Sequence, residues 1–269
     1  MIRIVLFDFD GVIIDSSKDI AAAVNKTFSH FGYGELSETE IIKHVGHGAE
    51  HLLACCLNDI CTKNHKSFNP EILPEIKRWY IDYYNSHAVV ETEIYPGVME
   101  LLRQLSLEDI RMGIVSNKPI KVTETILEHF DIIDYFDVMV GPELIKEIKP
   151  APDGIKLAVD TINKWITAIG ESEITPNQVL MVGDSGVDVK AAKNFGTFSC
   201  GVLGGIGNPE GVRAENPTFL VKAMTELKIS DILKLWVETL QWAGFRTHAV
   251  KMVLYVLVWT QIHLIFQNL

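Results

Sequence analysis

The chain has 269 residues, of which 48% are hydrophobic and 22% are charged, and its formal net charge is -11. This length is enough to bury a full core, and one α/β domain with a sizeable insertion is the natural expectation. The negative charge argues against nucleic acid or an anionic membrane surface as a partner, because both repel an acidic protein.

The N-terminus and the cysteines indicate a cytoplasmic protein. Residues 1–7 contain one Arg and no cleavable small-residue site, so no signal peptide is expected. The cysteines lack the paired CxxC spacing of a zinc site, which favours reduced and mostly buried thiols. They are Cys55, Cys56, Cys61 and Cys200.

The first element is an apolar run that ends in two carboxylates. Residues Ile2 to Phe7 are rich in Ile and Val and lack polar alternation, which is typical of a strand buried on both faces of a parallel sheet. Asp8 and Asp10 then lie just past its C-terminal end. Gly11 allows the chain to turn away without placing a side chain there.

Residues 16–92 follow a helical pattern without an intervening strand, which predicts an inserted all-helical cap. The first helix ends near Gly32, and Ser37 caps a second one. Gly46, His47 and Gly48 interrupt the pattern, and further helices are expected over Ala49 to Asn58 and Pro70 to His87. The aromatic residues of the last helix are expected in the core of the cap: Trp79, Tyr80, Tyr83 and Tyr84.

From Tyr95 onward, helices and strands alternate, which predicts a parallel sheet with crossover helices. The fold class is therefore α/β, with a Rossmann-like three-layer core from residues 1–15 and 93–236. Residues 237–269 form an apolar extension of unknown role. The expected helices are Val98 to Leu107, Pro119 to Phe130, Pro152 to Trp165 and Val189 to Phe195; the expected strands are Ile110 to Val115, Phe136 to Val140, Val179 to Val182, Phe198 to Val202 and one near Phe219.

Polar residues recur at or just after the ends of these strands. Besides Asp8 and Asp10, they are Ser116 with Asn117, Lys149, and Asp184 with Asp188. Because the carboxyl ends of parallel strands meet at one edge of a sheet, these residues are expected to line one crevice.

The two N-terminal acids suit phosphoryl transfer, which needs a nucleophile, neutralised phosphate oxygens and a metal ion. Asp8 can attack phosphorus to give an aspartyl-phosphate, while Asp10 protonates the leaving oxygen and later activates water. A lone pair of acids after a strand is more often a turn or a cap. The other strand ends therefore decide between the two interpretations.

Those strand ends supply the missing parts. The Asp8 and Asp184 carboxylates, with the backbone carbonyl of Asp10, suit Mg²⁺, and Asp188 can orient this ligand shell. Ser116 and the backbone N–H groups beside it can hold a phosphate oxygen. Lys149 adds a point charge next to the nucleophile.

Taken together, the motifs DFDGV, SNKP, IKPAP and GDSGVD resemble those of the haloacid dehalogenase superfamily of phosphatases, in the same order. The resemblance covers residues 1 to about 228 and implies Mg²⁺-dependent hydrolysis through an aspartyl-phosphate on Asp8, with Asp10 as acid and base. It also implies that residues 16–92 are a helical cap that closes over the crevice and excludes water.

Within that superfamily, residues 15–25 and 45–49 look like those of the phosphoglycolate phosphatase group. This likeness implies that the cap loop at Gly46, His47 and Gly48 contacts the non-phosphate part of a small phosphorylated metabolite, 2-phosphoglycolate. The glycine-rich stretch 204–207 also looks like a late loop of that group. A monomer or a homodimer is expected.

Other activities of the superfamily remain open. A dehalogenase or a phosphonate-cleaving relative does not need Asp10, and Lys43 is the available cap lysine for the latter. A sugar phosphomutase of the β-phosphoglucomutase type carries a cap His where this chain has the run Asp19-Ile20-Ala21. Nucleotidases and pyrophosphatases are further alternatives, and a non-catalytic binding module is expected to have lost an acid.

Two features lie outside the motifs. His44, His47 and His51 have the spacing of a zinc-binding helix face, but Gly46 and Gly48 break that helix. The apolar run 252–259 is shorter than the roughly 20 residues of a membrane span. It suits a docking helix, an oligomer contact, a weak membrane association or a non-native extension.

Overall fold

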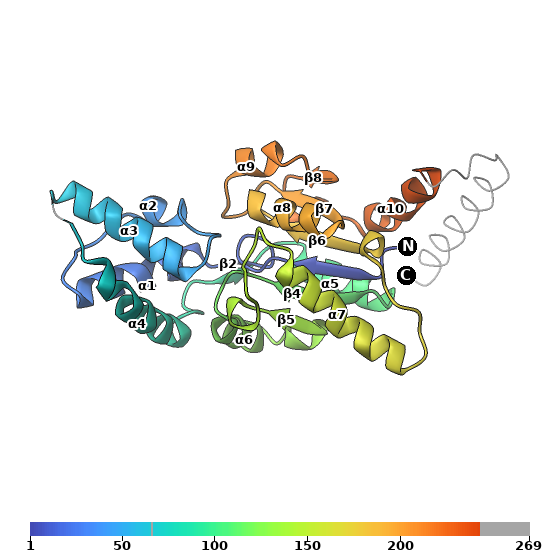
Figure 1. The fold of residues 1–269 in the computed structure, drawn as a ribbon, viewed down its shortest axis with the longest axis horizontal. Coiled ribbons are helices and arrows are strands. Elements are labelled where there is room, and N and C mark those ends of the chain that lie inside the picture. The colour runs from blue at the N-terminus through green and yellow to red at the C-terminus, as the bar shows by residue number, and fades with distance from the viewer. Residues whose placement is uncertain (66, 243–269) are drawn as a thin grey trace.

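The structure is a computed structural model that describes residues 1–65 and 67–242. Its centre is a six-stranded parallel sheet in the order β5-β4-β1-β6-β7-β8, so the first strand of the chain is an inner one (Figure 1). The strands are β1 (Ile4–Phe7), β4 (Arg111–Val115), β5 (Val138–Val140), β6 (Val179–Gly183), β7 (Phe198–Val202) and β8 (Phe219–Val221).

Apolar side chains cover both faces of the sheet, as the uninterrupted apolar run of β1 predicts. Val5 and Phe7 belong to one buried cluster, and Ile4 and Leu6 belong to another. The first cluster includes side chains from α5 (Val98–Leu107), α6 (Ile120–His129) and α10 (Ile229–Trp242), and the second includes side chains from α7 (Asp153–Ala168) and α8 (Gly186–Phe195). Helices therefore sandwich the sheet, and the predicted Rossmann-like α/β core is confirmed.

Two element boundaries differ from the sequence prediction for local reasons. The strand expected from Phe136 begins at Val138, because the backbone N–H of Phe136 donates to Ile133 and closes a 3₁₀ turn. The helix expected from Val189 begins at Gly186, because Ser185 and Asp188 form a capping box. Other short helices are α9 (Pro209–Ala214) and the 3₁₀ turns Pro70–Ile72, Ile133–Tyr135, Pro142–Leu144, Pro176–Gln178 and Met224–Glu226.

The helical insertion, residues 16–92, lies to one side of the sheet at the end where β2 is labelled (Figure 1). It contains α1 (Ser17–His30), α2 (Glu38–Ile42), α3 (Ala49–Lys63) and α4 (Leu73–Ser86). Helix α3 runs five residues past the expected end at Asn58, because Ile60 and Cys61 continue its buried face. Two short strands that the sequence analysis missed, β2 (Ile14–Asp15) and β3 (Glu93–Ile94), pair antiparallel where the insertion leaves and rejoins the core.

The aromatic residues of α4 divide between two faces. Tyr80 and Tyr84 are buried, as predicted, but their rings also line the pocket described below. Trp79 and Tyr83 are partly exposed and stack on each other with centroids 5.3 Å apart. Tyr83 nevertheless packs against the buried cluster, so the expected core position is wrong for Trp79 alone among these four residues.

The C-terminal helix extends into the stretch that the sequence analysis set apart as an extension. Residues 237–242 belong to α10, while 243–269 lie outside the described residues, so the expectations for the apolar run 252–259 stay predictions. Among residues 1–65 and 67–242, no helix combines the length and apolar character that crossing a bilayer requires. All four cysteines are free thiols, and three of them are buried, as expected.

A single buried carboxylate joins the two connections between insertion and core. Asp19, in the first turn of α1, is 3% exposed. Its oxygens accept hydrogen bonds from the backbone N–H groups of Val90, Glu91 and Thr92, and from the Thr92 hydroxyl, at 2.8–3.1 Å. The chain that enters the insertion is thereby tied to the chain that leaves it.

We expect Asp19→Ala to lower the free energy of unfolding by about 3 kcal/mol, because it removes a charged acceptor and leaves buried N–H donors unpaired. Urea unfolding followed by circular dichroism measures the change. Lys18→Ala is the matched control: its contact with Glu91, at 3.4 Å, joins the same segments through side chains that are 62% and 58% exposed. It should change stability by less than about 1 kcal/mol, and equal effects of the two substitutions would contradict the special role of Asp19.

Candidate active site

The two N-terminal acids lie where β1 ends. The backbone N–H of Asp8 continues the sheet by donating to Val182 at 2.8 Å, and the carboxylate Oδ1 of Asp8 accepts from the N–H of Phe9 at 2.7 Å. Gly11 then turns the chain with φ +83°, and a Cβ at this position would lie 1.7 Å from Oδ2 of Asp184. A glycine is therefore required both for the turn and for the approach of the second carboxylate.

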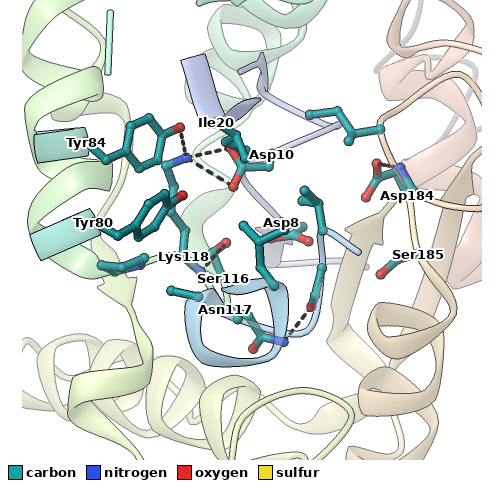
Figure 2. Close-up of a pocket in the computed structure, with 18 residues that line it drawn as sticks. Asp8, Asp10, Ile20, Tyr80, Tyr84, Ser116, Asn117, Lys118, Asp184 and Ser185 are labelled. Carbon is teal, nitrogen blue, oxygen red and sulfur yellow. Dashed lines mark hydrogen bonds and ion pairs between the residues drawn. The ribbon is translucent and has the colours of Figure 1, made fainter. Parts of the chain in front are cut away.

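The structure brings the polar strand ends together in one pocket between the sheet and the helical insertion (Figure 2). Asp8, Asp10, Ser116, Asn117 and Asp184 line its core side. The insertion supplies an opposite wall that is mainly apolar and aromatic. That wall consists of Ile20, Val45, Gly46, Gly48, Ala49, Leu52, Tyr80 and Tyr84.

Lys149 lies beneath this pocket, between two carboxylates. Its Nζ is 2.9 Å from Oδ1 of Asp8 and 2.6 Å from Oδ1 of Asp188, and its side chain is 1% exposed. Burial lowers the pKa of Lys149, but the attraction of Asp188 and Asp8 outweighs it and the net pKa is raised. The lysine therefore keeps its positive charge beside Asp8.

Asn117 fixes the segment that carries this lysine. Its side-chain oxygen accepts from the N–H of Lys149, and its amide group donates to the carbonyl of Lys149, both at 3.1 Å. The same amide group donates to the carbonyl of Gly46 at 2.8 Å. Asn117 thus links the Lys149 segment to the loop of the helical insertion.

Three buried carboxylates meet at the base of the pocket. One oxygen of each of Asp8, Asp184 and Asp188 lies within 4.8 Å of the others. Burial, with the negative charge of Asp188, raises the pKa of Asp8 to about 6, although Lys149 opposes the shift. Burial, followed by repulsion from Asp8 and Asp188, raises the pKa of Asp184 well above its usual value.

Asp184 is held by the glycine-rich loop that the sequence analysis noted at 204–207. The N–H of Gly207 donates to its Oδ2 at 2.7 Å. A Cβ on Gly205 would lie 2.3 Å from the same oxygen, so only glycine fits against this carboxylate. The loop therefore sets the orientation of Asp184 from a distant part of the sequence.

Both oxygens of Asp188 have protein partners. Its Oδ2 accepts from the backbone N–H of Ser185 at 3.0 Å and from the Ser185 hydroxyl at 2.5 Å, while Oδ1 faces Lys149. Asp188 therefore completes the capping box of α8, whose N-cap is Ser185, and pairs with the lysine at the same time.

The residues present fit a hard divalent cation. Three buried acids with one neighbouring lysine carry an excess of negative charge, and carboxylate oxygens are the ligands that Mg²⁺ prefers. Asp8 and Asp184 are the better placed ligands, because both oxygens of Asp188 have partners among the described residues. A bound cation would also relieve the repulsion that raises the pKa values of these two acids.

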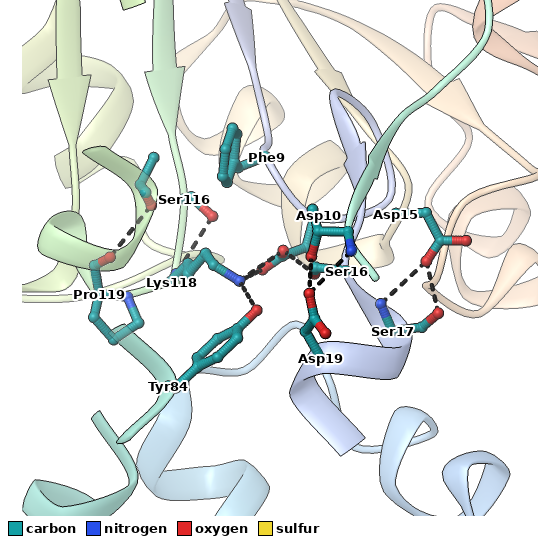
Figure 3. A network of polar contacts seen from close by, with 12 residues as sticks. Phe9, Asp10, Asp15, Ser16, Ser17, Asp19, Tyr84, Ser116, Lys118 and Pro119 are labelled. Atoms are coloured by element: carbon teal, nitrogen blue, oxygen red, sulfur yellow. Dashed lines mark hydrogen bonds and ion pairs between the residues drawn. The ribbon is translucent and has the colours of Figure 1, made fainter. Parts of the chain in front are cut away.

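Asp10 has two side-chain partners, Lys118 and Ser16, that the sequence analysis did not assign to the site. Nζ of Lys118 lies 2.9 and 3.2 Å from its two oxygens, and the Ser16 hydroxyl donates to its Oδ1 at 2.5 Å (Figure 3). Lys118 also donates to the hydroxyl of Tyr84 at 2.6 Å. Lys118 is part of the quoted SNKP motif, and Tyr84 was recognised only as a packing residue.

The loop of the helical insertion contributes its two glycines to the lining of the pocket, but not the histidine between them. Gly46 and Gly48 line the pocket, whereas His47 is exposed, is absent from that lining, and lies against His51 with ring centroids 4.9 Å apart. His44 pairs with Asp59 at 2.9 Å. Within residues 1–65 and 67–242, the set of three clustered acids, histidines or cysteines is the aspartate triad, so the histidines form no zinc site there.

Comparisons with known proteins identify the family of the chain. The model of the haloacid dehalogenase-like hydrolases matches residues 5–202. The chain belongs to this family. It is a phosphoric monoester hydrolase, and its relatives include phosphoglycolate phosphatases.

Two of these relatives are similar along most of their length. The phosphoglycolate phosphatase of Vibrio parahaemolyticus is 30% identical over 226 residues, which cover 84% of this chain and 94% of that protein. The Aquifex aeolicus phosphoglycolate phosphatase is 32% identical over 203 residues, covering 76% and 85%. A crystal structure of a predicted phosphoglycolate phosphatase from Haemophilus somnus superimposes with a TM-score of 0.74 at 26% identity, covering 87% of this chain and 98% of that one.

We expect Mg²⁺ binding to strengthen as pH rises through about 6, because a protonated Asp8 is a poor ligand. The pKa of Asp8 is higher in the folded chain than its ordinary 3.8, so the metal-free protein loses stability as pH rises from about 4 through 6. Mg²⁺ should reverse that loss. The measurement is the Mg²⁺-induced rise in Tm at pH 5 and at pH 7.5.

Asp8→Asn removes one of the two titrating carboxylates and should weaken this pH dependence, while Asp184, whose pKa is also raised, keeps part of it. Asp160→Asn is the control, because the Asp160 side chain is 46% exposed, pairs with Lys156 on the same helix and is no member of the triad. A Mg²⁺ effect of the same size at both pH values in the unmodified protein would contradict the expectation.

Proposed function

We propose that this phosphatase hydrolyses 2-phosphoglycolate to glycolate and phosphate, with Mg²⁺ as its cofactor and an aspartyl-phosphate on Asp8 as the intermediate. The observation that carries the substrate is the similarity to phosphoglycolate phosphatases across both core and insertion, which reaches 94% of one relative. The site geometry supports the reaction type independently of that similarity.

Asp8 is the proposed nucleophile. Its Oδ1 is fixed by the N–H of Phe9 and by Lys149, so the carboxylate is held in one orientation at the base of the pocket. Attack on phosphorus forms the Asp8–phosphate bond and breaks the bond to the leaving oxygen. Lys149 and the Ser116 side chain, which hydrogen-bonds Asp8, then stand beside the phosphoryl oxygens.

Asp10 is the proposed acid and base. It lines the same pocket two residues after Asp8, and it can donate a proton to the leaving oxygen and later take one from the water that hydrolyses the intermediate. Mg²⁺, held by Asp8, Asp184 and the backbone carbonyl of Asp10, would supply charge neutralisation for the phosphate. Asp188 would act through Lys149.

The helical insertion is proposed to act as the cap of the site. Its residues Ile20, Val45, Leu52, Tyr80 and Tyr84 line the same pocket as Asp8 and Asp10. In the proposed role, this mainly apolar wall keeps water away from the reacting atoms during the reaction. A closed wall of this kind suits a small leaving group. It does not suit a polymer or a phosphoprotein, which would have to extend through it.

We expect Asp8→Asn to reduce phosphate release to background while the protein stays folded, because the substitution removes the nucleophile and little buried apolar area. Asp10→Asn should retain Asp8 and lower the rate by about 10² to 10⁴-fold, the usual contribution of acid–base catalysis. Phosphate release with intact-mass analysis measures both, and a +80 Da species is expected for Asp10→Asn alone. Normal turnover in Asp8→Asn would contradict the covalent mechanism.

The substrate is tested by phosphate release across a panel of 2-phosphoglycolate, sugar phosphates, nucleoside monophosphates and pyrophosphate, with and without Mg²⁺. We expect the highest kcat/KM for 2-phosphoglycolate, and activity only with the metal. A preference for a sugar phosphate or a nucleotide would overturn the substrate while leaving the phosphatase reaction intact. Interconversion of sugar phosphates without net release would favour a phosphomutase.

A further inference from the structure

Lys118 is a buried cation on the wall of the pocket. Its side chain is 3% exposed, and its Nζ lies between Asp10 of the core and the hydroxyl of Tyr84 of the helical insertion (Figure 3). Nζ also lies 4.4 Å from the centre of the Tyr84 ring. Burying a lysine is costly, so its position calls for a role that a neutral side chain could not fill.

The contacts of Lys118 can be rearranged to admit a ligand. An ammonium group has three N–H donors, and its Nζ makes three contacts with described residues: the Tyr84 hydroxyl at 2.6 Å and the two Asp10 oxygens at 2.9 and 3.2 Å. The contact with Oδ2 of Asp10 is the longest, and Oδ1 alone is enough to keep the ion pair. An anionic group in the pocket can therefore replace Oδ2 as the third acceptor.

Lys118 differs in charge from the other residues of the pocket wall. Among the described residues that line the pocket, Lys118 alone has a basic side chain. Lys149 lies deeper and is engaged by Asp8 and Asp188. The wall from the helical insertion is apolar apart from its tyrosine hydroxyls, so an anionic group next to Asp10 has Lys118 as its cation.

We propose that Lys118 binds the carboxylate of the leaving group and so makes the enzyme specific for α-carboxylate phosphomonoesters. The proposal rests on the proposed function. In 2-phosphoglycolate a single methylene separates the leaving oxygen from the carboxylate carbon. The leaving oxygen and the nearer carboxylate oxygen therefore lie about 3 Å apart. When Asp10 donates to the leaving oxygen, the carboxylate falls within reach of a cation that is itself hydrogen-bonded to Asp10.

Tyr84 is the positioning residue in this arrangement. Its hydroxyl accepts from Lys118, and its ring packs beside the ammonium, which holds Nζ on the pocket side of Asp10. Burial, with the negative charge of Asp10, raises the pKa of Tyr84 well above its usual value, so the phenol stays neutral. Because Tyr84 belongs to α4, Lys118 is correctly placed only when the insertion lies against the core.

A pair of substrates separates this role from a general effect on Asp10. 2-Hydroxyethyl phosphate has the same skeleton as 2-phosphoglycolate, with a CH₂OH group in place of the carboxylate. If Lys118 acted only through Asp10, a substitution would lower kcat/KM equally for both compounds. If Lys118 binds the carboxylate, the loss is selective for 2-phosphoglycolate.

The experiment compares kcat/KM for both compounds in the unmodified enzyme, Lys118→Met, Lys118→Arg and Tyr84→Phe. We expect Lys118→Met to lose about 10 to 100-fold more with 2-phosphoglycolate than with 2-hydroxyethyl phosphate, which is the range for one charge-assisted hydrogen bond. Lys118→Arg should retain most of the preference, and Tyr84→Phe should lose part of it. Lys121→Met, an exposed lysine on α6, should change neither value.

Each outcome decides the proposal. A preference for 2-phosphoglycolate that survives unchanged in Lys118→Met overturns the role of Lys118 and leaves the proposed substrate standing. An unmodified enzyme that hydrolyses phosphate esters without preferring the carboxylate overturns both. Should Lys118→Met fail to fold, an unaltered substrate ratio in Tyr84→Phe, combined with loss of the preference in Lys118→Arg, would contradict the proposal.

Discussion

The crowding of three carboxylates at the buried end of the sheet is the constraint on which the rest of the site depends. Asp8, Asp184 and Asp188 repel one another in a place where water cannot screen them, and one lysine only partly offsets their charge. Backbone N–H groups of the neighbouring segments help to offset this excess of negative charge. The N–H groups of Phe9, Ser185 and Gly207 each point at one of these acids.

The same constraint explains the distribution of glycines near the triad. Gly11 and Gly205 have no side chain because Oδ2 of Asp184 occupies the space that a Cβ would fill. The polar groups are thus packed as tightly as an apolar core. The packing leaves the repulsion among the three acids in place, and this repulsion would favour the binding of a cation. The folding energy would then hold the proposed metal ligands in position.

The core and the insertion meet through few but specific polar contacts. Asn117 reaches the carbonyl of Gly46 from the strand side, and Lys118 reaches the hydroxyl of Tyr84. Both residues follow Ser116, so one short segment after β4 lines the core side of the pocket and touches two parts of the insertion. This segment can therefore couple the position of the insertion to the arrangement around Asp8 and Asp10.

The sequence was sufficient to predict the sheet and the residues at its carboxyl edge, because buried parallel strands are apolar and short and their ends converge by geometry. It was insufficient for Lys118, Tyr84 and Ser16, whose meeting depends on how the insertion packs against the core. Asp188 shows a second limit, since its acidic side chain indicated a metal, but it also forms a capping box with Ser185, the N-cap three residues earlier. His47 shows a third, because a histidine between two glycines can point away from the pocket that the glycines line.

The two-residue strands β2 and β3 place both ends of the insertion side by side. With respect to the core, the whole helical unit is one long insertion whose two ends are held together by the antiparallel β2–β3 ribbon. The entropy of closing a loop grows only slowly with its length, so the core tolerates units of very different size at this point. A graft that keeps the ribbon and exchanges the helices would therefore change the wall of the pocket that the insertion supplies and leave the carboxyl edge of the sheet intact.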